Sequence, residues 1–155
     1  KKVDVIRRCF YEKEADFSAD DNYQDHVDNL SKELMDGKLF VRGYSKDGRA
    51  LYVILTHMFE ANGFNHDWYM RYNIYTLERA LACTERASNG KLEKVICAFD
   101  FGQYSNAVRM PLSLSKEISH CLRDHYPERV EKILLVDAPF IFRAFYNLAY
   151  PFIDA

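Results

Sequence analysis

The stretch that decides the fold of this chain lies at residues 125–152 and reads HYPERVEKILLVDAPFIFRAFYNLAYPF. Tyr126-Pro127 ends the helix before it, because proline disfavours helical geometry in the preceding residue and has no N–H to donate. Residues 133–136, ILLV, form a continuous apolar run of strand length, which is typical of a strand covered on both faces. We therefore predict a strand in the middle of a sheet.

A predicted apolar helix follows this strand. Pro139 suits a first helical position, and residues 140–150 then contain only Arg143 and Asn147 as polar interruptions. A helix that is apolar all round is buried, faces lipid or awaits a partner. It is too short to cross a bilayer, which takes about 20 residues. We interpret it as a core helix, with a surface that meets lipid as the alternative.

Helices and strands alternate upstream of this stretch. The sequence predicts amphipathic helices at 3–16 and 22–36, strands at 39–44 and 50–56 joined by the hairpin turn Ser45-Lys46-Asp47-Gly48, the longest helix at 65–88 with Asn65 as its cap, a buried strand at 95–99, and a helix with the apolar stripe Leu114, Ile118, Cys121, Leu122 and His125. This order predicts an α/β fold with a largely parallel sheet. A boundary near residue 37 separates an N-terminal helical segment, 1–37, from the sheet-containing domain, 38–155.

Composition narrows the function classes. The chain has 155 residues, enough for one domain with a real core, and 15% aromatic residues, which suits a large interior or a cavity lined by rings. Its net charge of −2 without a basic segment disfavours nucleic acid and a polybasic membrane anchor. The four cysteines form no Cys-x-x-Cys pair, so we expect free thiols in a reducing compartment. The start without Met or signal peptide suggests a fragment.

The sequence contains little evidence of a catalytic site or a metal site. Asp100, after the strand at 95–99, is a candidate carboxylate, but with no partner acid, base or nucleophile in view we interpret it as an acceptor of N–H groups in the next bend. No phosphate-loop glycine pattern or Gly-x-Ser-x-Gly elbow occurs. Cys121 and His125 lie four apart, as metal ligands can, yet lack a second pair. Arg49 has two equally supported interpretations: a solvent-exposed residue at the start of a strand, or a partner in an ion pair. We expect no enzyme, cofactor or metal.

Ordered motifs resemble the signature of the CRAL-TRIO lipid-binding family, which includes phosphatidylinositol transfer proteins, the tocopherol transfer protein and the retinaldehyde-binding protein. They are Asp47-Gly48-Arg49 before an apolar strand, Ala98-Phe99-Asp100 before a glycine-containing bend with Ser105, Tyr126-Pro127-Glu128-Arg129 before a second apolar strand, Ala138-Pro139-Phe140 with Phe142, and Pro151-Phe152-Ile153-Asp154. Together they cover roughly residues 39–155.

The resemblance implies a three-layer fold in which a largely parallel sheet is the floor of an apolar pocket and helices are its walls. It implies non-catalytic lipid binding or transfer by a cytoplasmic protein, peripheral to membranes, that meets membrane surfaces transiently and binds no nucleic acid. Lipid contacts are expected at Glu128, Tyr72, Val95, Cys97, Phe99, Tyr104, Phe140, Phe142 and Phe145. The alternative is a protein-interaction or membrane-targeting module attached to a signalling protein.

Departures from the family pattern refine these expectations. The family's domain continues past the position of Asp154 with a helix and strand, so this chain is expected to expose an apolar patch and self-associate.

In the branch of the family that carries phosphatidylcholine, hydroxyl side chains on the second buried strand reach the phosphate of the lipid. Val95 and Cys97 occupy those positions here and offer no comparable hydrogen bonds. Without the resemblance, Glu128 would be interpreted as an exposed turn residue. In the family, the matching position lies near the inositol ring of the bound lipid. The resemblance therefore favours phosphatidylinositol or a neutral apolar ligand.

Overall fold

The computed structural model describes residues 23–58, 65–102 and 112–140. The predicted helix at residues 3–16 lies outside these ranges, as does the predicted apolar helix beyond Phe140. The described elements, in chain order, are α3 (Tyr23–Asp36), β1 (Leu39–Tyr44), β2 (Ala50–Leu55), the 3-10 turn η1 (Thr56–Met58), α4 (His66–Ala87), β3 (Val95–Asp100), α5 (Leu112–His125) and β4 (Val130–Val136). No described helix is long and apolar enough to cross a membrane.

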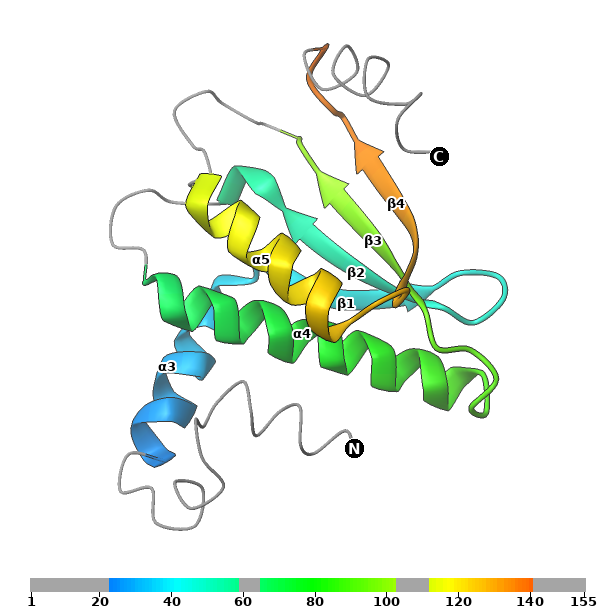
Figure 1. Ribbon diagram of the computed structural model, residues 1–155, viewed down its shortest axis with the longest axis horizontal. Helices are drawn as coiled ribbons and strands as arrows, with labels where there is room; N and C mark the ends of the chain where they lie inside the picture. The colour runs from blue at the N-terminus through cyan, green and yellow to red at the C-terminus, as the bar shows by residue number, and fades with distance from the viewer. Residues whose placement is uncertain (1–22, 59–64, 103–111, 141–155) are drawn as a thin grey trace.

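Four strands form one mixed sheet in the order β1-β2-β3-β4. β1 pairs antiparallel with β2, whereas β2 with β3 and β3 with β4 pair in parallel. α4 and α5 connect the parallel strands and lie side by side in front of the sheet (Figure 1), where Glu78 of α4 accepts a hydrogen bond from the Tyr126 hydroxyl at 2.8 Å. This arrangement confirms the predicted α/β fold with a largely parallel sheet.

The hydrophobic core lies between the sheet and these two helices. Along β2, Ala50, Tyr52 and Ile54 are buried and the residues between them are half-buried, because successive side chains of a strand point to opposite faces. Leu77 of α4 and Leu114 of α5 are fully buried in the same core. We call the sheet face that carries Tyr52 the covered face.

The β1–β2 hairpin forms at the predicted turn. The backbone N–H of Ser45 donates to the carbonyl oxygen of Arg49 at 2.8 Å, and the N–H of Gly48 donates to the carbonyl oxygen of Ser45 at 3.0 Å. Gly48 has φ +93°, a conformation that residues with a Cβ rarely adopt. The Asp-Gly signal therefore predicted the hairpin because its geometry depends on one residue with positive φ.

α4 begins and ends as its sequence predicts. Oδ1 of Asn65 accepts the backbone N–H of Trp68 at 3.1 Å, Asp67 lies in the first turn, and Arg86 lies in the last turn. Both charges are placed favourably for the helix dipole. The chain leaves the helix through Asn89 and Gly90, which have φ values of 52° and 79°.

The Asn65 cap leads to a stability prediction. Asn65→Ala removes the acceptor for one orphan N–H of α4 and should lower the free energy of unfolding by about 0.5–2 kcal/mol in urea denaturation. Asn65→Asp is the matched control, because aspartate supplies the same acceptor and favours the positive helix end, so its effect should be near zero. Equal losses in the two variants would contradict a capping role for Asn65.

The predicted central strand lies at the edge of the sheet that the described residues form. β4 is the edge strand of the described sheet, with β3 as its neighbour, and its residues Ile133, Leu134, Leu135 and Val136 are 59%, 39%, 42% and 44% exposed. It also begins three residues earlier than predicted, at Val130. An apolar run specifies a strand but not how many neighbours it pairs with, and within the described residues β4 has one neighbour.

The predicted stripe of α5 is correct except at its end. Leu114 is fully buried, and Ile118, Cys121 and Leu122 pack partly buried against the core. His125 is exposed, because α5 ends there and the chain turns away through the buried side chain of Tyr126. Tyr126 therefore provides the contact that the stripe assigned to His125.

Candidate functional site

Three of the predicted lipid contacts share one face of β3. Val95, Cys97 and Phe99 alternate along the strand, and Cys97 pairs in register with Tyr52 of β2, so all three lie on the covered face. Val95 and Cys97 are buried in the core, and Phe99 packs against it partly buried. The structure brings these residues together on the side of the sheet where α4 and α5 lie.

Tyr72, the predicted contact from α4, is fully buried against β1. Its hydroxyl donates to the carbonyl oxygen of Leu39 and accepts the backbone N–H of Leu39 at 3.0 Å. The hydroxyl of Tyr72 is thus both donor and acceptor to the backbone of β1, and these bonds hold α4 against the sheet. A ligand that bound to this hydroxyl would have to replace one of these bonds.

A buried hydrogen-bonding pair between β2 and α4 escaped the sequence analysis. The hydroxyl of Tyr52 donates to Oδ1 of Asn73 at 2.9 Å, and both side chains are buried. Tyr69, four residues before Asn73, is buried beside them. The available signal was Asn73 itself, a polar residue at helical spacing from Tyr69 and Leu77. We call Tyr52, Tyr69, Tyr72, Asn73 and Cys97 the tyrosine cluster.

The tyrosine cluster is neutral at physiological pH. Burial raises the pKa of the Cys97 thiol to about 11, and burial raises the pKa of Tyr52 well above its usual value. Burial likewise raises the pKa of Tyr69 and of Tyr72, although the bond to the Leu39 backbone partly offsets the shift at Tyr72. A thiol with this pKa is a poor nucleophile near pH 7. The cluster offers neutral hydrogen-bonding groups in apolar surroundings.

Glu128 lies in the turn between α5 and β4, with an exposed side chain and φ 56°. This left-handed conformation is uncommon for residues other than glycine and costs roughly 1–2 kcal/mol. No ion pair or hydrogen bond of the Glu128 carboxylate occurs within residues 23–58, 65–102 and 112–140. The carboxylate is therefore presented to solvent from a backbone position that would suit glycine better.

The residues on either side of Glu128 are fixed by hydrogen bonds. The backbone N–H of Arg129 donates to the carbonyl oxygen of Tyr126 at 3.2 Å, and the Arg129 carbonyl accepts the N–H of Val95 at 2.9 Å. The Arg129 guanidinium donates to Oε2 of Glu93 at 2.8 Å. These contacts hold the turn against β3.

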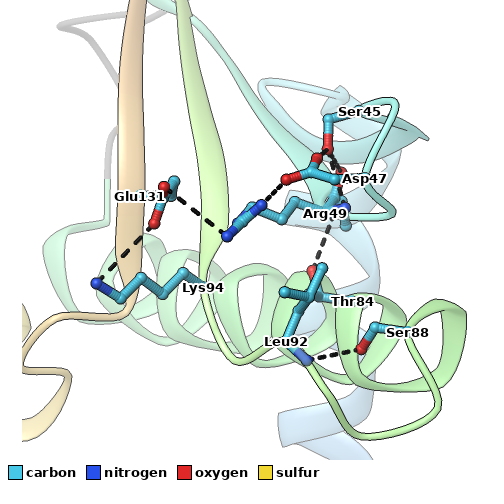
Figure 2. A network of polar contacts seen from close by, with 9 residues as sticks. Ser45, Asp47, Arg49, Thr84, Ser88, Leu92, Lys94 and Glu131 are labelled. Atoms are coloured by element: carbon cyan, nitrogen blue, oxygen red, sulfur yellow. Dashed lines mark hydrogen bonds and ion pairs between the residues drawn. The ribbon is translucent and has the colours of Figure 1, made fainter.

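A second set of charges fixes the start of β4, as Figure 2 shows. Arg49 has a side chain only 17% exposed and lies between Asp47 of the hairpin and Glu131 of β4, with its Nη2 at 3.8 Å from Oε1 of Glu131. Lys94 approaches the other oxygen of Glu131 at 3.9 Å. Of the two interpretations of Arg49, the ion-pair role is confirmed. The network ties the hairpin to the edge strand beside Glu128.

Asp100 has the structural role that we preferred for it. Its Oδ1 accepts the backbone N–H of Gly102 at 2.8 Å in the bend after β3. Among the described residues no group of three or more histidine, cysteine, aspartate or glutamate side chains could hold a metal ion. Cys83, Cys97 and Cys121 are free thiols, and Cys9 lies outside the described ranges.

The predicted contacts do not all meet at one place. Glu128 precedes β4 next to Val95, at the amino end of β3, whereas Tyr72 binds Leu39, which faces Ile54 near the carboxyl end of β2. These two side chains therefore mark opposite ends of the sheet. Phe140 is 84% exposed. Tyr104, Phe142 and Phe145 lie outside the described residues.

Comparison with known proteins assigns the chain to a family. The model of the CRAL/TRIO domain matches residues 34–155, which is most of the sequence. The chain belongs to the CRAL-TRIO family. Its membership agrees with the motifs of the hairpin, the bend after Asp100 and the turn that carries Glu128.

Three CRAL-TRIO relatives show how much of a longer protein this chain represents. The phosphatidylinositol transfer protein PDR17 of Saccharomyces cerevisiae is 28% identical over 133 residues, covering 83% of this chain and 36% of the relative. A CRAL-TRIO domain-containing protein of Schizosaccharomyces pombe is 28% identical over 128 residues, covering 82% and 12%. Another from Saccharomyces cerevisiae is 27% identical over 150 residues, covering 86% and 47%. The chain thus spans less than half the length of each.

Proposed function

We propose that this chain is a non-catalytic lipid-binding or lipid-transfer domain that holds a phospholipid, with phosphatidylinositol favoured, or another small apolar ligand. The observation that carries the proposal is its membership of the CRAL-TRIO family across residues 34–155. The relative PDR17, which is named a phosphatidylinositol transfer protein, supports this class of ligand. Burial of acyl chains would supply the binding energy, at about 0.8 kcal/mol for each methylene removed from water.

The polar groups of the site support a preference among head groups. Val95 offers no hydrogen bond, and the protonated Cys97 thiol is only a weak donor, so a phosphate beside them would lack strong partners. Glu128 instead presents a carboxylate, which accepts hydrogen bonds from hydroxyl groups such as those of an inositol ring. The fixed turn around Glu128 reduces the entropy that such a contact would cost.

The test is competitive extraction from mixed liposomes of phosphatidylinositol, phosphatidylcholine and a neutral lipid, with bound lipid identified by mass spectrometry. Phosphatidylinositol or the neutral lipid should dominate. Glu128→Ala should weaken phosphatidylinositol binding by roughly 10- to 100-fold, because hydrogen bonds to a charged group contribute about 1.5–3 kcal/mol. Binding of the neutral lipid should stay unchanged.

Glu128→Gly is the matched control for this experiment. It removes the same carboxylate but relieves the positive φ, so it should be at least as stable as the wild type and still lose phosphatidylinositol binding. Recovery of binding in the glycine variant would show that backbone strain, and not the carboxylate, caused the loss in Glu128→Ala. Phosphatidylcholine as the dominant cargo of the wild type would contradict the head-group preference.

The exposed apolar residues of β4 favour a second candidate function, a protein-interaction or membrane-targeting module. Ile133 is 59% exposed, and an exposed apolar edge strand is a common place for another chain to pair. The same surface supports self-association of this chain. Native mass spectrometry of the protein after exposure to cell-derived lipids separates the two functions, because an interaction module would carry no lipid.

A further inference from the structure

The outward side of α4 carries a stripe of aromatic and basic side chains. Trp68, Tyr75, Arg79 and Arg86 follow one another at intervals of seven, four and seven residues, which return to one side of a helix, and Arg71 lies beside them. Arg79 and Arg86 are exposed, and the other three are half-exposed. We call these five residues the α4 stripe. It extends roughly 27 Å along a helix that runs the length of the sheet (Figure 1).

Two cation–π pairs organise the α4 stripe. The Arg71 guanidinium carbon lies 5.5 Å from the centre of the Trp68 ring, and that of Arg79 lies 5.7 Å from the centre of the Tyr75 ring. Nη1 of Arg79 also approaches the Tyr75 hydroxyl at 3.4 Å. A guanidinium stacked on a ring keeps its N–H donors in a fixed plane, which suits bidentate binding of phosphate.

The acidic residues of α4 lie on a different edge of the helix. Asp67, Glu78 and Glu85 follow one another at intervals of eleven and seven residues, about a quarter of a turn from Trp68, Tyr75, Arg79 and Arg86, and Arg71 lies between the two sets. Glu78 accepts the hydrogen bond from Tyr126 after α5, so this acidic edge is the one next to α5. The other four residues of the stripe therefore lie farther from α5 than the acidic edge does.

We propose that the α4 stripe is the surface by which this domain docks on an anionic membrane. Arginines supply the charge that anionic head groups attract, and tryptophan and tyrosine rings are the side chains that favour the head-group level of a bilayer. The chain has a net charge of −2, so the whole molecule is not drawn to such a surface and the local stripe must orient it. This inference rests on the proposed lipid-binding function, because a lipid carrier has to meet the membrane that supplies its cargo.

Trp68 makes the test direct because it is the only tryptophan of the chain. The full chain is titrated with vesicles of phosphatidylcholine containing about 30% phosphatidylserine, and with vesicles of phosphatidylcholine alone. Docking through the stripe should shift the Trp68 emission to shorter wavelength with the anionic vesicles only. The shift should disappear at high ionic strength, because salt screens exposed charges.

A triple variant, Arg71→Gln with Arg79→Gln and Arg86→Gln, should bind the anionic vesicles on the order of 100-fold more weakly, since each arginine near such a surface contributes about fivefold. The matched control is Arg42→Gln with Lys46→Gln and Lys116→Gln. These three side chains are exposed on β1, the hairpin and α5, and their loss changes the net charge equally. Thermal melts check that both variants fold.

Each outcome decides between the alternatives. An equal loss of vesicle affinity in the control variant would attribute binding to net charge and overturn the proposal. Binding of the protein to vesicles in a sedimentation assay without a change in Trp68 emission would also overturn it. An absence of binding to anionic vesicles, even if an acidic peptide binds the stripe, also overturns it. Lipid found in the purified protein without docking refutes this inference alone. Docking through the stripe without any extracted lipid refutes the proposed function alone and indicates a membrane-targeting module.

Discussion

Above pH 9 the free energy of unfolding should fall steeply, by roughly 3 kcal/mol per pH unit above pH 10, where Tyr52 and Tyr69 remain protonated in the folded protein. Burial raises the pKa of Cys97, Tyr52, Tyr69 and Tyr72 in the folded protein, from starting values of 9.0 for the thiol and 10.0 for the tyrosines. The unfolded chain therefore loses these protons first. Because the folded pKa values are the higher ones, the stability that these groups contribute is complete below pH 9. It is lost as the pH rises towards the folded values.

The measurement is urea denaturation at half-unit steps from pH 8 to pH 11, followed by circular dichroism. Tyr52→Phe is the informative variant, because it removes one titrating group and should reduce the slope by about 1.4 kcal/mol per pH unit, whatever its effect at pH 8. A free energy of unfolding that stays level across this range would mean that water reaches the tyrosine cluster, and that α4 does not cover the sheet as described.

Leu114→Ala should lower the free energy of unfolding by about 2–5 kcal/mol. Leu114 is fully buried and is the deepest contact of α5 with the core, so its removal leaves a cavity. Ile133→Ala removes a comparable side chain from β4, where it is 59% exposed, and should cost about 1 kcal/mol or less.

Chemical denaturation of the two variants tests the position of β4 at the edge of the described sheet. The apolar run at residues 133–136 predicts burial on both faces, and burial would make Ile133→Ala as costly as Leu114→Ala. The structure places Ile133 on the edge strand and predicts a clear difference between the two changes. Equal costs would show that another surface covers β4 in solution.

Local signals predicted most of the individual elements. The cap at Asn65, the turn at residues 45–48 and the end of the long helix near residue 88 each depend on residues within a few positions of one another. Sequence can determine such features because the competing conformations differ in local hydrogen bonds and backbone sterics. The family resemblance then implied the same largely parallel sheet.

The candidate site was predicted less completely, because its contacts join distant parts of the chain. Tyr52 and Asn73 are 21 residues apart, and nothing local indicates that one donates to the other. The arginines of the α4 stripe are spread over residues 71–86, so the sequence shows no basic segment there. These arginines lie on one surface only because α4 is helical and buries its other side against the sheet.

The sequence by itself determined the type of each described α-helix and strand, the largely parallel sheet and the cap that begins α4. Only the tertiary structure decided that β4 is the outermost strand of the described sheet, that the hydroxyl of Tyr72 binds the backbone of Leu39, and that Glu128 lies in a turn held by hydrogen bonds. The physical reason is that backbone preference and hydrophobic period act over a few residues, whereas burial and hydrogen-bond partners depend on which elements pack together. The number of neighbours that a strand acquires is a property of the assembled sheet.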